Sequence, residues 1–155
     1  MNASPSPHIF IHANALIVGE TGLLLRGPSG AGKSALTLEL LSLARQQGDF
    51  ARLIGDDRVS LEANGGRLIA RPHPKIAGMI EARGLGILHQ PYEAGGVIHA
   101  IVDLTPDAAA HERLPELPTQ SASLLDISLP RRCISARNPR AGVVIINFIQ
   151  LLTQN

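Results

Sequence analysis

The stretch LLLRGPSGAGKSALTLELLSLARQQG, residues 23–48, decides how this chain folds. Its first residues belong to an apolar run over 22–26 that is typical of a strand, and residues 27–34 match the pattern Gly-x-x-x-x-Gly-Lys-Ser. Residues 33–47 are strong helix formers with leucines at helical spacing, and Gly48 is a helix stop signal. A strand, a glycine-rich loop and a helix in this order are the context of a phosphate-binding loop.

The glycine-rich loop predicts a site for the phosphates of a nucleotide. Glycines allow backbone angles that turn successive N–H groups inward, toward an anion at the helix N-terminus. Pro28 has no N–H group, so the donors come from Ser29 onward. We expect Lys33 to lie over the β- and γ-phosphates and to face solvent without them, and the Ser34 hydroxyl to hold Mg²⁺. The predicted nucleotide-binding residues are Gly27, Ser29, Gly30, Ala31, Gly32, Lys33 and Ser34.

The rest of the chain carries mainly strand signals, which are apolar or β-branched runs bounded by Gly, Pro and Asn. The closing segment 141–152 fits a helix, although its β-branched residues suit a strand equally well. We therefore expect an α/β fold, a P-loop domain with a central mixed sheet flanked by helices. The expected strands are 9–18, 22–26, 52–55, a hairpin over 59–71, 97–104 and 124–129, with loops over 106–120.

The composition fits one compact domain in a reducing compartment. The chain has 155 residues, of which 45% are hydrophobic and 17% charged, and this argues against intrinsic disorder. A net charge of +1 and 3% aromatic residues argue against a nucleic-acid partner. Cys133 is the single cysteine, so it forms no intramolecular disulfide and by itself no zinc site. The histidines without metal-ligand spacing, expected on the surface or in loops, are His73, His89, His99 and His111.

The N-terminus and the apolar runs indicate a cytoplasmic protein. Residues 1–7 are rich in Pro and Ser and are expected to form a flexible tail before a single catalytic domain over 8–155. No export signal follows Met1, and no apolar stretch approaches the roughly 20 residues that span a bilayer. The sequence therefore predicts no membrane partner.

Two adjacent carboxylates, Asp56 and Asp57, follow the apolar residues 53–55. A carboxylate at the end of a parallel strand beside the phosphate loop is expected to act on the metal or on the nucleophile. Side chains alternate along a strand, so we expect one aspartate to face the site and the other to turn aside. The alternative is a turn cap before Arg58. Because the sequence contains no guanine-specific Asn-Lys-x-Asp segment and no ABC-type signature, a small kinase is the leading class.

Four motifs, in order and spacing, resemble the catalytic domain of HPr kinase/phosphorylase. They are His12, the loop at 27–34, the pair Asp56-Asp57 and the segment EARGLGI at 81–87. The resemblance implies ATP-dependent phosphorylation, with Mg²⁺ as cofactor, of a serine on HPr or a related carrier. HPr is the small phosphocarrier of the bacterial sugar phosphotransferase system.

The resemblance also implies roles for single residues. One aspartate of the pair, Asp56 or Asp57, corresponds to the proton acceptor. Ser34 and Glu81 correspond to metal ligands, and His12 to a residue near the phosphates. The implied catalytic set is Asp56, Asp57, His12, Lys33 and Arg83.

This chain departs from the family pattern at three places. It begins almost at the catalytic domain, and in this it resembles the short form found in some proteobacteria. Ala35 replaces the usual glutamate after Lys-Ser, and residues 131–140 do not reproduce the Pro-Gly-Arg-Asn segment tied to dephosphorylation. The resemblance therefore implies the kinase and leaves phosphorylase activity without support.

The residues leave several alternatives open. If the phosphate acceptor is not a protein, the chain is a small-molecule kinase on the same framework. If no phosphate is transferred, the chain is a nucleotide-dependent switch. Glu81 and Arg83 alternatively form a surface ion pair beside a glycine turn. The four arginines in residues 131–140 either grip an acidic partner or a phosphate, or form a solvated basic face. The family's long form is an oligomer, so a homo-oligomer is a further alternative.

Overall fold

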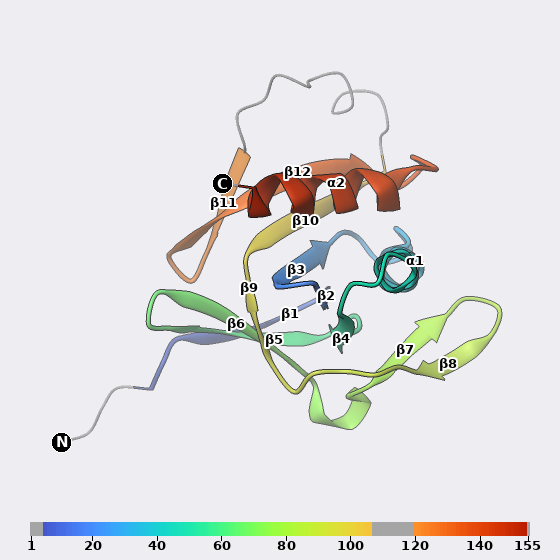
Figure 1. Ribbon diagram of the computed structural model, residues 1–155. Coiled ribbons are helices and arrows are strands. Elements are labelled where there is room, and N and C mark those ends of the chain that lie inside the picture. Colours follow the sequence, from blue (N-terminus) through green and yellow to red (C-terminus); the bar gives the residue numbers. More distant parts are fainter. Residues whose placement is uncertain (1–4, 107–119, 155) are drawn as a thin grey trace.

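The computed structural model describes residues 5–106 and 120–154, which form two α-helices and the strands of three sheets (Figure 1). Residues 1–4 of the predicted tail and almost all of the loops predicted over 106–120 lie outside the described residues. The elements are β1 His8–Ile11, β2 Ala13–Val18, β3 Thr21–Arg26, α1 Lys33–Gln46, β4 Ala51–Gly55, β5 Val59–Asn64, β6 Arg67–Pro72, the 3₁₀ turn η1 Pro74–Ile76, β7 Met79–Ala82, β8 Gly86–His89, β9 Gly96–Ile98, β10 Ala100–Thr105, β11 Gln120–Leu124, β12 Ile127–Ser135 and α2 Ala141–Thr153.

The central sheet has six strands in the order β11-β12-β10-β3-β2-β4. β10 pairs in parallel with β3 and β12, whereas the β2–β3, β2–β4 and β11–β12 pairs are antiparallel. The predicted mixed sheet is therefore confirmed. The strand before the two aspartates runs in the same direction as the loop strand β3, as expected, because both pair antiparallel with β2. That strand is β4, which pairs antiparallel with β2, and β2 separates it from β3.

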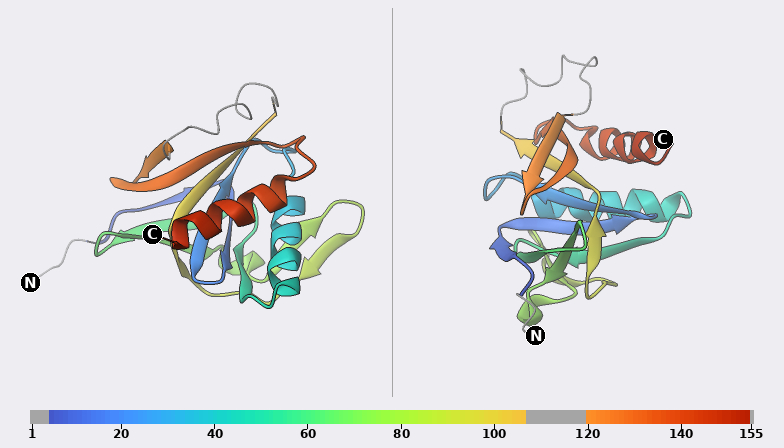
Figure 2. Two further views of the ribbon diagram at one scale, coloured as in Figure 1. Left: turned by 45° about the horizontal axis from the view of Figure 1, so that its top comes forward. Right: turned by 90° about the vertical axis from the view of Figure 1, so that its left-hand side faces the viewer.

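The central sheet is covered by helices on one face and by the four-stranded sheet, in the order β1-β5-β6-β9, on the other (Figure 2). Along β3, Leu23 and Leu25 pack in a core cluster with both helices. Leu24 points to the opposite face and packs with residues of β5, β6 and β9. This alternation has the period of two that a strand buried on both faces requires. Both described helices of the predicted α/β class thus flank the same face.

Two predicted strands are broken where the chain passes from one sheet to the other. The run over 9–18 bends at His12, so β1 pairs with β5 in the four-stranded sheet and β2 pairs with β3 in the central sheet. The run over 97–104 breaks at His99 in the same way, between β9 and β10. Because the residues on each side of a break pack against different partners, the apolar pattern continues through the break and hides it.

The single strand predicted over 124–129 was also wrong, because a tight turn divides it. Leu125 and Asp126 have positive φ, 50° and 63°, and join β11 to β12 as an antiparallel hairpin. Two positive φ angles are typical of a type I′ turn, whose usual signal is Asn-Gly. The Leu-Asp pair carries no such signal. β12 then continues to Ser135, through the first half of the basic stretch 131–140.

The predictions for the helices and for the first hairpin are confirmed. α1 covers all but the last residue of the predicted range 33–47, and β5 and β6 form the hairpin expected over 59–71. The segment 141–152, which left helix and strand open, is the helix α2. Its buried side chains, among them Ile145 and Phe148, pack in the same cluster as those of α1, and this contact favours the helix. Neither of the described helices is long and apolar enough to cross a membrane.

Candidate active site

The glycine-rich loop, residues 27–32, leads from β3 into α1 with two glycines in the left-handed conformation. Gly30 has a φ of 82°, and Gly32, the N-cap of α1, has a φ of 94°. Other residues are strained at such angles, so these glycines are needed for this path of the backbone. No described side chain caps α1, which leaves N–H groups of its first turn to a ligand or to water. The N–H of Ala31, in contrast, donates to the Pro28 carbonyl (3.0 Å).

Lys33, the first residue of α1, folds back onto this loop. Its ammonium donates to the carbonyl oxygens of Gly27 (2.7 Å) and Pro28 (3.2 Å), and the residue is 6% exposed. The expectation that Lys33 faces solvent was therefore wrong. An ammonium beside carbonyl oxygens gains charge-assisted hydrogen bonds that a free side chain lacks. The positive charge is thus held against the loop that it is predicted to serve.

The carboxylate of Asp56 joins three elements at the end of the central strands. Its Oδ1 accepts hydrogen bonds from the Ser34 hydroxyl of α1 (2.5 Å) and from Nδ2 of Asn14 in β2 (2.8 Å). Its Oδ2 accepts from the backbone N–H of Glu81 in β7 (3.0 Å). Asp56 is 6% exposed. A turn cap bonds to neighbouring backbone groups only, so these distant partners contradict the alternative that Asp56 merely caps a turn.

Asn14 is a residue of this site that the sequence analysis missed. Its side chain is fully buried, and besides Asp56 it donates to the hydroxyl of Thr37 in α1 (2.9 Å). Its Oδ1 accepts from the backbone N–H of Asp57 (2.9 Å). Thr37 in turn donates to the Lys33 carbonyl (2.8 Å). The available signal was an asparagine within the apolar strand ANALIV, since a polar residue buried in such a strand needs a partner.

We expect Asn14→Ala to destabilise the fold strongly, because it leaves Asp56, Thr37 and the Asp57 N–H without a shared partner. One unsatisfied buried polar group costs about 1–3 kcal/mol, so the free energy of unfolding should fall by at least that amount. Urea denaturation measures the change. Asn147→Ala on the exposed face of α2 is the matched control and should leave stability nearly unchanged. Equal stability of the two variants would contradict the role of Asn14.

Asp57 differs from Asp56 in its surroundings. It is exposed and has a φ of 62°, and no described residue forms a hydrogen bond or ion pair with its carboxylate. The aspartates therefore face different environments, as predicted. The reason is a different one, because β4 ends at Gly55 and the chain turns at Asp57 instead of continuing as a strand.

The side chains of the other predicted site residues are exposed at the rim of the candidate active site. Glu81 reaches Asp56 with its backbone N–H, while its side chain and that of Arg83 are exposed on the β7–β8 hairpin. Among the described residues no ion pair joins Glu81 to Arg83, which contradicts the surface-pair alternative. His12 is exposed at the bend between β1 and β2. The structure thus gathers Ser34, Asp56 and the Glu81 backbone, and leaves the side chains of Glu81, Arg83 and His12 outside this cluster.

An ion cluster beside the loop engages one of the arginines in residues 131–140. Arg26, the last residue of β3, donates to both carboxylate oxygens of Asp103 (2.7 and 2.8 Å), and Arg131 donates to Oδ2. Burial raises the pKa of Asp103, but the hydrogen bonds from the two arginines outweigh burial and hold this pKa below its ordinary value of 3.8. The Arg131 guanidinium is therefore engaged in an ion pair within the protein.

This cluster predicts an acid-sensitive contribution to stability. A carboxyl group whose folded pKa is lowered stabilises the fold above its unfolded pKa and loses that effect as the pH falls through the folded value. We expect Asp103→Asn to lower the free energy of unfolding at pH 7 by about 1.5–3 kcal/mol, the range for hydrogen bonds to charged groups. The difference between variant and wild type should shrink as the pH falls below 3.8. Denaturation curves at pH 7 and below pH 3.8 test this, with the exposed residue Glu20→Gln as control, and a difference independent of pH would contradict it.

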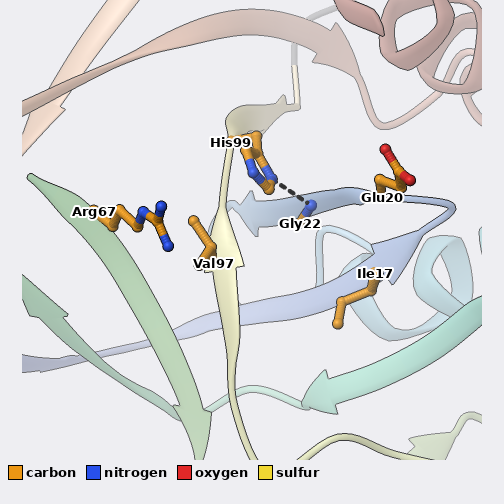
Figure 3. Close-up of a pocket in the computed structure, with 6 residues that line it drawn as sticks. All are labelled: Ile17, Glu20, Gly22, Arg67, Val97 and His99. Carbon is orange, nitrogen blue, oxygen red and sulfur yellow. Dashed lines mark hydrogen bonds between the residues drawn. The ribbon is translucent and has the colours of Figure 1, made fainter.

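A cavity of about 450 Å³ at the other end of β2 takes no part in this site (Figure 3). His99 lines it, and the Nδ1 atom of this histidine accepts a hydrogen bond from the Gly22 N–H (2.9 Å). The backbone N–H of His99 donates to the Gly22 carbonyl (2.8 Å). Gly22 permits this approach, since a Cβ there would lie 1.8 Å from the Val97 carbonyl oxygen. His99 is therefore a structural residue that ties β3 to the chain between β9 and β10.

The donor atoms around Asp56 suit Mg²⁺. The Ser34 hydroxyl and the Asp56 carboxylate offer oxygen, the ligand that Mg²⁺ prefers. In residues 5–106 and 120–154 no three His, Cys, Asp or Glu side chains are grouped so that they could hold a metal ion. Mg²⁺ typically binds one or two carboxylates together with phosphates and water. This donor set therefore fits a cation that protein and phosphate hold together.

The mixed sheet, the two helices and the Asp56 carboxylate, which contacts α1, β2 and β7, define the class: an α/β domain with a polar site at the ends of its central strands. Within that class, the chain belongs to the family of the HPr Serine kinase C-terminal domain, whose family model matches residues 4–152. The resemblance found in the four sequence motifs is thereby confirmed.

Individual relatives agree with this family. The HPr kinase/phosphorylase of Treponema pallidum (strain Nichols) is 34% identical over 154 residues, which cover 91% of this chain and 46% of the relative. That of Caldanaerobacter subterraneus subsp. tengcongensis is 32% identical over 151 residues, covering 91% and 47%. The chain thus spans less than half the length of these relatives. The solved structure of the Hpr(Ser) kinase/phosphatase from Coxiella burnetii shares the fold, with a TM-score of 0.77 and 24% identity over 94% of this chain and 91% of that one.

Proposed function

We propose that this chain is the catalytic domain of an ATP-dependent protein kinase that phosphorylates a serine of HPr or a related phosphocarrier. The observation that carries the proposal is the Asp56 carboxylate, which is held against the Ser34 hydroxyl at the start of α1 (2.5 Å). This contact places a carboxylate beside the loop that is predicted to bind the nucleotide. Family membership supports the same activity.

In this proposal the loop and the start of α1 form the phosphate site. The backbone N–H groups from Ser29 onward, apart from that of Ala31, which donates to the Pro28 carbonyl, face the phosphate oxygens. The Lys33 ammonium exchanges the Gly27 and Pro28 carbonyls for the β- and γ-phosphates. In the exchange, phosphate oxygens take the place of the two carbonyl oxygens as acceptors for the ammonium. The proposed nucleotide-binding residues are Gly27, Ser29, Gly30, Ala31, Gly32, Lys33 and Ser34.

Ser34 is the proposed direct ligand of Mg²⁺, with Glu81 at the rim as the second ligand. When bound, Mg²⁺ supplies positive charge to the phosphate oxygens. The Asp56 carboxylate orients the Ser34 hydroxyl, and Asn14 and the Glu81 N–H orient Asp56 in turn. Such a chain of hydrogen bonds fixes the ligand before the cation arrives.

One carboxylate of the pair accepts the proton of the acceptor serine as it meets the γ-phosphoryl group. Asp56 lies next to the loop but has both oxygens engaged, whereas Asp57 is exposed and turned away from the strand. The assignment within the pair is left to the variants described below. His12 and Arg83 at the rim are proposed to contact the phosphates. Location in the cytoplasm and assembly of several copies stay predictions of the sequence.

Incubation of the chain with γ-labelled ATP, Mg²⁺ and purified HPr tests the proposal. We expect label on HPr and none on an HPr variant whose acceptor serine is alanine. Label on a metabolite instead would favour the small-molecule kinase, and nucleotide binding without transfer would favour the switch. Either result would overturn the proposed protein kinase.

A further inference from the structure

Asp57 lies at the centre of a tight three-residue turn that follows β4. The N–H of Arg58 donates to the Asp56 carbonyl (2.7 Å), and Asp57 between them has a φ of 62°. A hydrogen bond between residues i and i+2 around a positive φ is the pattern of a γ-turn that is rare and strained. Strained backbone of this kind persists only where neighbouring groups hold it. The turn that carries the aspartate pair therefore needs a partner outside itself.

That partner is the side-chain amide of Asn14 in β2. Its Oδ1 accepts a hydrogen bond from the N–H of Asp57 (2.9 Å), and its Nδ2 donates to Oδ1 of Asp56 (2.8 Å). One amide thus holds the backbone of one aspartate and the carboxylate of the other. A flipped amide would set its oxygen against the Asp56 carboxylate and its NH₂ group against the Asp57 N–H. Only one orientation of the amide therefore satisfies both aspartates.

Thr37 of α1 fixes this orientation from the helix side. Its hydroxyl donates to the Lys33 carbonyl (2.8 Å) and accepts the second N–H of the Asn14 amide (2.9 Å). A hydroxyl has a single hydrogen, and because that hydrogen is committed to Lys33, Thr37 can only accept from Asn14. Asn14 and Thr37 are both 0% exposed, so water does not compete for these contacts.

These hydrogen bonds form one chain from α1 to the aspartate pair. The chain starts at the Lys33 carbonyl, passes through Thr37 and Asn14, and ends at the two aspartates. Lys33 and Ser34 lie in the first turn of α1 and are the predicted phosphate and metal ligands. The position of the carboxylates is therefore tied to the helix turn that carries the predicted nucleotide-binding residues.

Packing alone does not account for a polar pair between β2 and α1. Leu16 of β2 and Leu40 of α1 belong to one buried apolar cluster. When apolar groups of the same shape replace both partners of a buried hydrogen bond, stability changes little. The contact at Asn14 and Thr37 could therefore be apolar as well. An apolar pair, however, cannot accept the Asp57 N–H or donate to the carboxylate beside it.

We propose that Thr37 is a positioning residue for phosphate transfer, which acts through Asn14 to hold the strained turn at Asp57 and the carboxylate of Asp56. The role in phosphate transfer rests on the proposed function, whereas the hold on the turn rests on the hydrogen bonds alone. Loss of the Thr37 hydroxyl leaves Asn14 with two of its three partners, so the amide can turn and the alignment of both aspartates is relaxed. The backbone hydrogen bonds of α1 are kept, so the nucleotide-binding residues are expected to stay in place.

Hydrogen exchange of the Asp57 amide, followed by NMR, tests the hold without any kinase activity. Thr37→Val keeps the shape of the side chain but lacks the hydroxyl. We expect it to speed this exchange about two- to tenfold, the equilibrium factor for one neutral hydrogen bond. Thr37→Ser restores the hydroxyl and should exchange as wild type does. The amide of Val102 in β10, at the centre of the sheet, reports global unfolding and corrects for any change of overall stability. An unchanged Asp57 rate in Thr37→Val, or a fast rate that Thr37→Ser does not restore, would overturn the hold.

Steady-state rates with labelled ATP and HPr test the role in phosphate transfer. We expect Thr37→Val to lower kcat about two- to tenfold at an unchanged KM for MgATP, and Thr37→Ser to behave as wild type does. A threonine with a structural role only would lower the melting temperature and leave kcat of the folded protein unchanged. Thr153→Val is the matched control, because the exposed Thr153 hydroxyl also donates to a carbonyl of its own helix, that of Gln150 (3.0 Å).

The two measurements separate a failure of this inference from a failure of the proposed kinase. If wild type labels HPr and Thr37→Val turns over at the same rate, the positioning role is overturned and the kinase is kept. If wild type transfers no label to HPr, the proposed kinase fails, and the role of Thr37 in transfer fails with it. Faster exchange of the Asp57 amide in Thr37→Val would still support the hold on the turn in that case.

Discussion

Asp56→Asn is expected to lower the turnover of phosphate transfer about 10²–10⁴-fold, the usual contribution of a positioned acid or base. The carboxylate accepts hydrogen bonds from Ser34, Asn14 and the Glu81 N–H. The asparagine side chain in its place has only one acceptor oxygen. Its NH₂ group faces hydrogen-bond donors that the second carboxylate oxygen can no longer accept from. The variant therefore loses the alignment of Ser34 as well as the carboxylate, and either loss lowers turnover. Steady-state rates with ATP and HPr measure the effect.

Asp57→Asn distinguishes the two aspartates. Asp57 is exposed, and asparagine tolerates its positive φ, so the free energy of unfolding should not change. A loss of turnover as large as that of Asp56→Asn would assign the proton acceptor to Asp57, and a small loss would assign it to Asp56. Asp49→Asn, an exposed carboxylate after α1, is the matched control. Wild-type turnover in both site variants would contradict the catalytic interpretation of the pair.

The parts of the fold that depend on local sequence were predicted well. The glycine-rich loop and α1 follow from neighbouring residues, because positive φ at Gly30 and Gly32 and the helical spacing of leucines are encoded within one segment. The mixed sheet was also predicted, whereas the type of the segment 141–152 was left open and the hairpin of β7 and β8 was not predicted. The turn at Leu125 and Asp126 shows the limit, since its φ angles are imposed by strand pairing and not by the residue types.

The missed parts of the candidate site depend on contacts between distant segments. Asn14 joins Asp56 across 42 positions of sequence and Thr37 across 23. Its position in an apolar strand reveals burial, but the partners follow only from the packing of β2 against α1 and β4. His73 lies in the loop between β6 and η1, as predicted. Only the register of β1, β5 and β6 places it beside His12 and Arg58.

The contact network also explains why the motifs work as one unit. The Ser34 motif lies on α1, the aspartate pair follows β4, and Glu81 lies on β7. The carboxylate of Asp56, a member of the pair, accepts hydrogen bonds from the other two, so a change in any of them disturbs this shared contact. The sequence motifs are therefore separated along the chain but meet at one group of atoms.

Lys33→Ala is expected to lower phosphate transfer about 10²–10³-fold, the loss typical of removing one group that stabilises charge in the transition state. The affinity for MgATP should fall as well, because the same ammonium contacts the phosphates of bound nucleotide. Folding should survive. The Gly27 and Pro28 carbonyls that Lys33 contacts belong to a loop that is partly exposed, so water can replace the ammonium there.

The sequence offers a matched control for this charge, because Lys33 and Lys75 are its only lysines. Lys75 is exposed in η1, so Lys75→Ala removes one positive charge without touching the loop. Calorimetry with MgATP and turnover with HPr compare the two variants, and thermal melting checks that both are folded. We expect loss in Lys33→Ala and wild-type behaviour in Lys75→Ala. Equal turnover in both would mean that the Lys33 ammonium serves only the Gly27 and Pro28 carbonyls, and the loop would then lose its assignment as the nucleotide site.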